Sequence, residues 1–144
     1  MIQFNCGIHD LTLKDESGQS IKEGQQGKAW VPLDEYRANL EKIITRLQKT
    51  GATLTWCTST PMVDGLPHRK LADIAIYNEA AKEIMQRHQI RISDLHSFVQ
   101  RDGKPKFRDY GHFTVEGCRE MAEYLAPSIT AALAEQASKG KSNR

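Results

Sequence analysis

The sequence predicts an α/β fold in which helices cover both faces of a parallel β-sheet. Short apolar or β-branched runs alternate with amphipathic stretches of helical spacing, in the order strand, helix, strand, helix, strand, helix. The first two predicted strands stop at Gly7 and Pro61, as strands do before a loop. Parallel neighbours need a crossover connection, and the predicted helices lie where such connections are required.

The first predicted strand is the apolar run Met1–Asn5, which ends abruptly at Cys6 and Gly7. The composition then turns to Lys, Asp, Ser, Gly and Gln from Leu13 to Gly27. We expect this stretch to be a flexible loop or an excursion over the top of the sheet.

The first predicted helix has Pro32 and Asp34 near its start and Gly51 as its stop. Its length corresponds to about four turns. Apolar residues recur at helical spacing and predict one buried face: Tyr36, Leu40, Ile43, Ile44 and Leu47.

The segment Ala52–Pro61 is rich in β-branched and aromatic residues and predicts the second strand. Helical spacing returns in Asp73–Gln89, and Ile90–Leu95 predicts a short third strand. The apolar positions that indicate the second helix are Ile76, Ala80, Ile84 and Met85.

The last predicted helix runs from about Val115 to Ala134. Residues 1–137 are thus expected to form one domain, and the basic segment 138–144 is expected to be a disordered, solvated tail. The apolar face of the last helix comprises Met121, Ala122, Leu125, Ile129 and Leu133.

Composition narrows the classes of function. A chain of 144 residues with 39% hydrophobic and 26% charged residues is typical of one soluble globular domain. The net charge of +2 gives no argument for nucleic acid as a partner, and no apolar run reaches the roughly 18 residues of a membrane span.

The cysteines and the first residues bear on location. Cys6, Cys57 and Cys118 are odd in number and widely spaced, which predicts neither a disulfide framework nor a metal site. The first residues lack the features of a signal peptide, so the chain as given is expected to be cytoplasmic, unless a longer N-terminus carries such a signal.

In a parallel α/β sheet, chemistry gathers at the carboxyl ends of the strands. The loops that begin at Cys6, Thr58, Asp94 and Arg108 would all open on that edge. The last of these loops holds Asp109 and His112, a spacing that suits a carboxylate orienting an imidazole. Such an imidazole would need a nucleophile to activate. Taken alone, the two residues could instead be a turn-and-cap pair at the start of the last helix.

Several segments taken together resemble the SGNH or GDSL-type hydrolases. These segments are "FNCGIHDL", "TWCTSTP", "YNEAA", "IRISDL" and "DYGHFTVEG", and the similarity covers almost the whole chain. The resemblance implies a three-layer, flavodoxin-like αβα fold. It also implies cleavage of esters, often acyl groups on carbohydrates or lipids, with a small-molecule or carbohydrate ester as substrate and with no cofactor.

The family's last block is Asp-x-x-His, and Asp109 and His112 match it as the catalytic pair. The third block is Gly-x-Asn-Asp, and here it stands as Gly7, Ile8, His9 and Asp10, with histidine in place of asparagine. The resemblance thus implies that His9 donates a hydrogen bond in the oxyanion hole, because a neutral imidazole retains one N–H.

A subset of the family resembles this variant more fully, with Asn-x-Gly-x-His-Asp on the same loop. On this resemblance Asn5, Gly7 and Asp10 are expected to support the site or to bind substrate.

The family's first block, Gly-Asp-Ser, and the glycine of its second block have no counterpart in this chain. The nucleophile is therefore unassigned. The resemblance implies a member that lacks its first strand or strands, as a fragment, a late start or one part of a split protein. The strand Met1–Asn5 would then be an exposed edge, through which we expect self-association.

Two further residues have competing interpretations. Ser59 follows the second strand but lacks the strained glycine turn of an exposed nucleophile, so we expect a structural hydrogen bond that closes the strand. Arg69 lies in the loop after that strand, where it would either hold an anionic or hydroxyl-rich substrate or be a plain surface charge.

Three functions remain open at this point. The first is a serine esterase of the SGNH type whose nucleophile-bearing segment is missing from this chain. The second is a non-catalytic remnant or a binding module. The third is a metal-dependent hydrolase built on His9, Asp10, Asp109 and His112, whose spacing matches no metal motif, so no metal is predicted.

Overall fold

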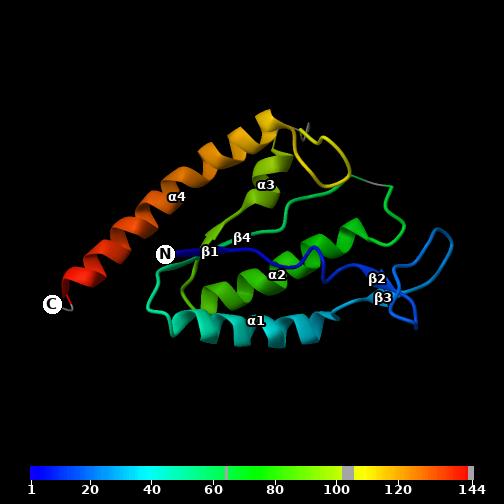
Figure 1. The fold of residues 1–144 in the computed structure, drawn as a ribbon, viewed down its shortest axis with the longest axis horizontal. Coiled ribbons are helices and arrows are strands. Elements are labelled where there is room, and N and C mark those ends of the chain that lie inside the picture. Colours follow the sequence, from blue (N-terminus) through cyan, green and yellow to red (C-terminus); the bar gives the residue numbers. More distant parts are fainter. Residues whose placement is uncertain (64, 102–105, 143–144) are drawn as a thin grey trace.

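The computed structural model describes residues 1–63, 65–101 and 106–142 (Figure 1). Within them, β1 (Ile2–Phe4), β4 (Leu54–Cys57) and β5 (Arg91–Ser93) form a parallel sheet in the order β1-β4-β5. Phe4 lies opposite Trp56. The predicted α/β fold with a parallel sheet is confirmed, and β1 forms one edge of that sheet.

Two helices cover one face of the sheet. These are α1 (Leu33–Gln48) and α2 (Leu71–Arg87), which lie side by side beneath the strands in Figure 1. Trp56 of the central strand is fully buried, as its place in the predicted second strand requires. The core between these helices and the sheet contains Tyr36, Leu40, Ile44, Leu54, Ile74, Tyr77, Ala81, Ile84 and Met85.

The third layer lies on the other side of the strands (Figure 1). It is formed by α4 (Val115–Ser142) with the short helix α3 (Leu95–Gln100), which the sequence did not predict. The side chain of Asp94 caps α3 by accepting a hydrogen bond of 3.1 Å from the Ser97 amide. The rings of Phe98 and Tyr124 stack with centroids 4.3 Å apart and join the two helices.

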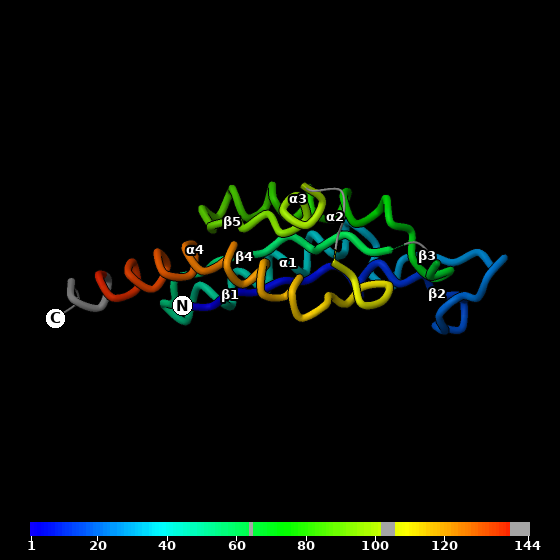
Figure 2. The backbone as a smooth tube through the Cα atoms, turned by 90° about the horizontal axis from the view of Figure 1, so that it is seen from above, coloured from blue at the N-terminus to red at the C-terminus, as the bar shows by residue number. Residues whose placement is uncertain are grey.

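For the polar stretch from Leu13 to Gly27 the sequence left two alternatives, a flexible loop or an excursion over the top of the sheet, and the structure shows a segment that contains a strand and buried side chains. It begins with β2 (Leu13–Lys14), which pairs antiparallel with β3 (Lys28–Ala29). The side chains of Leu13 and Ile21 are buried, so two apolar residues fix this polar segment to the domain. The resulting hairpin projects from one end of the molecule, as Figure 2 also shows.

Some predicted faces and bounds need correction. Ile43 and Ile76 are 42% and 50% exposed, because the buried faces are centred on Leu40 in α1 and on Ala81 in α2. In α4 the fully buried residue is Ala132, whereas Leu133 is 53% exposed.

The last helix does not end at Ala134. It continues to Ser142, so positions 138–142 of the expected disordered tail are helical. The segment after Leu133 is rich in Ala, Glu, Gln and Lys, which are strong helix formers, and this composition explains the extension. The last two positions of the expected tail, Asn143 and Arg144, lie outside the described residues.

Candidate functional site

A cleft of ≈ 770 Å³ opens at the carboxyl end of β1. It lies between the loop after β1, the loop before α2 and the turn before α4. The residues predicted for the site all line this cleft: Asn5, Gly7, His9, Asp10, Arg69, Asp109 and His112. Loops far apart in sequence meet here because parallel strands place their carboxyl ends at one edge.

Asp109 and His112 occupy the tip of a tight turn. Phe107 and Phe113 form an antiparallel bridge at the base of this turn, with ring centroids 4.8 Å apart. The Arg108 amide donates to the His112 carbonyl at 2.8 Å and closes the turn. Local hydrogen bonds and one aromatic contact therefore present the pair to the cleft.

The imidazole of His112 is held by the Asp109 carboxylate. Nδ1 of the ring lies 2.8 Å from Oδ1 and 3.0 Å from Oδ2, and a carboxylate can only accept, so Nδ1 carries the proton. In the neutral ring Nε2 is then left as the acceptor. The side chain of His112 is 74% exposed, so Nε2 is accessible to a reacting group.

The charge on Asp109 is stabilised by backbone as well as side-chain donors. Oδ1 accepts hydrogen bonds from the amides of Gly111 at 3.1 Å and His112 at 3.0 Å. These two backbone bonds, followed by the bond from the His112 ring, lower the pKa of Asp109 from 3.8 to about 2. Asp109 is thus an anion at neutral pH and fixes the His112 tautomer.

The loop after β1 forms the opposite wall of the cleft. Gly7 has φ of +135°, and a Cβ placed there would lie 3.1 Å from Oγ of Ser59. Any larger side chain at this position would be strained and crowded, which explains why the loop has glycine here. The amide of Leu11 bonds to the Gly7 carbonyl at 3.2 Å, so the loop turns back at once and leaves His9 and Asp10 lining the cleft.

The other residues of this loop have different degrees of constraint. Asn5 is fixed by a hydrogen bond of 2.7 Å from Nδ2 to the Cys57 carbonyl. The side chain of His9 is exposed, and in the described part of the chain its ring makes no hydrogen bond. A neutral imidazole can carry its proton on either ring nitrogen, and none of these residues fixes which nitrogen of His9 carries it.

Ser59 has the structural role that the sequence predicted. It is 4% exposed, and its Oγ donates to the Cys6 carbonyl at 3.4 Å. No serine or threonine is among the described residues that line the cleft. The thiol of Cys6 does line it, but burial raises the pKa of that thiol and keeps it protonated.

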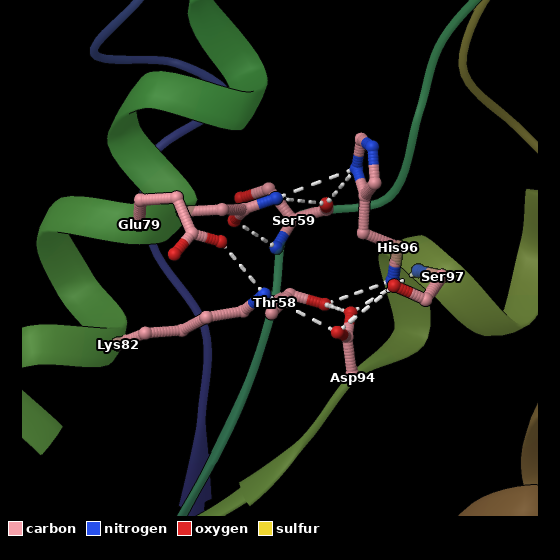
Figure 3. Close-up of polar contacts among 8 residues, drawn as sticks. Thr58, Ser59, Glu79, Lys82, Asp94, His96 and Ser97 are labelled. Atoms are coloured by element: carbon pink, nitrogen blue, oxygen red, sulfur yellow. Dashed lines mark hydrogen bonds and ion pairs between the residues drawn. The ribbon is translucent and has the colours of Figure 1, made fainter. Parts of the chain in front are cut away.

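Sequence reasoning missed a polar network that fixes the end of β4 (Figure 3). The amide of Asn78 bonds to both backbone groups of Ser59, at 2.8 Å to the nitrogen and 2.9 Å to the oxygen. Nδ1 of His96 lies 3.1 Å from the same carbonyl. The Thr58 hydroxyl donates to Asp94 at 3.1 Å, so this strand end is joined to both α2 and α3.

This network positions the chain that follows β4, which contributes Met62, Leu66 and Arg69 to the cleft. In the sequence its members stand in separate segments, with Thr58 and Asp94 at the start of two predicted loops and Asn78 in the "YNEAA" segment, and nothing there indicates that they meet. Tyr110 was missed for a similar reason, because its place between Asp109 and Gly111 carries no periodic signal.

Two further features bear on other functions. Among the residues that the structure describes, His, Cys, Asp and Glu side chains do not form a group of three or more that could hold a metal ion. None of the described helices combines the length and the hydrophobicity that a membrane crossing requires.

Comparison with known proteins gives a likeness in fold. No protein-family model matches the sequence, and no curated protein matches it either. Among solved structures, the chain is similar to the crystal structure of an acetyl xylan esterase, with a TM-score of 0.57 and 17% sequence identity. The alignment covers 74% of this chain and 58% of the other, so the chain spans less than two thirds of that protein. At this identity the likeness shows a shared α/β fold.

Proposed function

We propose that the cleft belongs to an SGNH-type serine esterase that removes acyl groups, such as acetyl, from a carbohydrate. The observation that carries this proposal is the hydrogen-bonded pair Asp109 and His112, whose Nε2 is free to accept a proton. The likeness in fold to an acetyl xylan esterase supports the proposal, and so does the match of the two loops to the family's motifs.

Each residue has a distinct part in the proposed reaction. His112 takes the proton of an attacking hydroxyl through Nε2 and later delivers it to the leaving alcohol. Asp109 stabilises the imidazolium that forms between these steps, as its low pKa allows. His9 donates its ring N–H to the oxyanion of the tetrahedral intermediate.

The attacking hydroxyl is the component that the described cleft lacks, because no serine or threonine lines it. We therefore propose that the serine belongs to a segment outside residues 1–144 and reaches His112 from the open side of the cleft. Residues 1–144 on their own are then expected to be inert as an esterase.

Hydrolysis of nitrophenyl acetate and of acetylated xylooligosaccharides tests this proposal. The assay compares the 144-residue chain with the same chain extended by the residues that its gene encodes upstream of Met1. We expect turnover from the extended chain alone. His112→Ala should then cost about as much as loss of the serine, since members of a triad act as a unit.

His68→Ala is the matched control, because His68 belongs to a neighbouring loop but does not line the cleft. This variant should retain full turnover. Near-full activity in His112→Ala would overturn the assignment of the base. Turnover by the 144-residue chain that disappears in Ser59→Ala would show that Ser59 is the nucleophile and that our interpretation of it is wrong.

A further inference from the structure

Arg69 differs from three other arginines of this protein in having no ion-pair partner among the described residues. Arg37, Arg87 and Arg91 lie at the surface and each forms an ion pair with a glutamate. Arg69 instead lines the cleft, and within the described residues no carboxylate lies within ion-pair distance of it. Among the described residues, the Arg69 guanidinium is thus left without a counter-ion in the cleft.

The position of Arg69 is fixed by its backbone and by one weak side-chain contact. Its amide donates to the Leu66 carbonyl at 3.1 Å, directly before α2 begins. Its Nη1 lies 3.5 Å from the sulfur of Met62, a poor acceptor. Its Nε is buried and has no hydrogen-bond partner among the described residues.

An unsatisfied charged donor of this kind is costly. A buried N–H without an acceptor loses the hydrogen bonds that it made to water, and the cost is greater for a charged group. Burial also lowers the pKa of Arg69, in keeping with a partly desolvated guanidinium. The folded protein therefore gains if an anionic acceptor enters the cleft and compensates this partly desolvated guanidinium.

The acidic residues of the cleft do not supply that acceptor. Asp109 is engaged by the amides of Gly111 and His112, by the His112 ring and by Arg108 at 3.5 Å. Asp10 also lines the cleft but forms no ion pair with Arg69. Arg69 is accordingly available to a ligand.

We propose that Arg69 binds a carboxylate of the substrate, so that the cleft takes an acylated acidic sugar. This inference rests on the proposed esterase function and specifies its substrate. A planar guanidinium offers paired N–H donors, including those of its two terminal nitrogens, that match the two oxygens of a carboxylate. A neutral sugar hydroxyl would satisfy one donor and leave the charge uncompensated.

The test uses equilibrium binding, which needs no turnover. Methyl glucuronoside and methyl glucoside differ in the carboxylate and serve as the two probes, measured by calorimetry on the 144-residue chain. We expect binding of the glucuronoside that Arg69→Gln weakens about 10- to 100-fold. Arg69→Lys keeps the charge but loses the paired geometry and should bind with intermediate affinity.

Lys70→Gln is the matched control, because it removes one positive charge from the neighbouring, exposed position. It should leave the affinity within about twofold, as expected for a screened surface charge. The NMR signal of the Arg69 Nε–H should move on addition of the glucuronoside and stay in place with inorganic phosphate at the same concentration, if the site selects a carboxylate.

Three results would overturn the inference. Equal affinity for the glucuronoside and the glucoside would make Arg69 a binder of neutral hydroxyl groups. Equal weakening by Arg69→Gln and Lys70→Gln would show a general effect of charge. A phosphate-induced shift as large as that from the glucuronoside would show an unselective anion site. If Arg69 is needed for binding but His112→Ala does not change the rate of hydrolysis, the esterase proposal is contradicted and the anion site is retained.

Discussion

On one face of the sheet α1 and α2 pack as a pair of long helices, whereas on the other the long helix α4 is joined only by the short helix α3. The paired side buries whole aliphatic and aromatic side chains, with Ile44, Ile84 and Met85 at 0% exposure. On the α4 side Ala132 is fully buried, Tyr124 stacks on Phe98 of α3, and the Thr53 amide donates a bond of 2.5 Å to Gln136.

The two faces also differ in how closely side chains fill the space beside β1. A hollow of ≈ 400 Å³ lies there, and Phe4, Ile8, Leu95, Phe113 and Met121 contribute its apolar lining. β1 itself is an edge strand, paired with β4 alone in the described residues. The tightly packed core and this hollow therefore lie on different sides of the sheet, so that each can be perturbed separately.

The largest expected effect is a loss of stability on the side of the sheet that α1 and α2 cover. Ile84→Ala should lower the free energy of unfolding by about 2–5 kcal/mol, because it leaves a cavity among fully buried neighbours. Ile129→Ala in α4 removes a partly buried side chain and should cost about 1 kcal/mol or less. Urea denaturation followed by circular dichroism measures both. Equal losses would mean that α4 is packed as tightly as α2.

The next effect concerns the open edge. The Ile2 amide bonds to Thr53 at 2.9 Å, so by the alternation of a parallel ladder the amide of Gln3 points away from β4. We expect β1 strands of two copies to pair through these free groups and to give a dimer. Gln3→Pro removes the free N–H and should shift the molecule toward monomer in sedimentation equilibrium.

Gln3→Ala is the control for this variant. It removes the side-chain bond of 3.2 Å to the Cys57 sulfur and keeps the backbone amide, so the dimer should persist. A wild-type chain that is monomeric at all concentrations would mean that the edge is protected in another way.

The smallest effect is a titration in the cleft. The pKa of Asp109 is lowered to about 2, so its contribution to the turn is complete above the ordinary value of 3.8 and is lost as the pH falls through about 2. A carbon-13 NMR titration of the carboxyl group should show this midpoint. His112→Ala should raise it while leaving it below 3.8, because the two leading causes are backbone amides. A wild-type midpoint near 3.8 would show that the turn is not formed.

Periodicity predicted most of the fold because the strands and the first two helices carry their own signals. It failed where tertiary packing decided the outcome. Leu13 and Ile21 are isolated apolar residues in a polar segment, and their burial depends on the domain beneath them. α3 is too short for a helical period to be seen, and its start depends on the cap that Asp94 supplies.

The polar residues expected at the site could be named from sequence because two short motifs and one loop position carry them. Their partners could not be named. Asn78 contacts Ser59 from another element, and Met62 gains its place from the network at the end of β4. Such contacts arise from folding and leave no local pattern.

Whether the nucleophile lies outside residues 1–144 is tested most directly by intact-mass spectrometry after treatment with a fluorophosphonate, a reagent that modifies activated serines. We expect no adduct on the 144-residue chain. We expect one adduct on the upstream-extended chain, at a serine outside residues 1–144, formed much more slowly in His112→Ala. An adduct on Ser59, or labelling that is unaffected by His112→Ala, would show that the proposed triad is wrong.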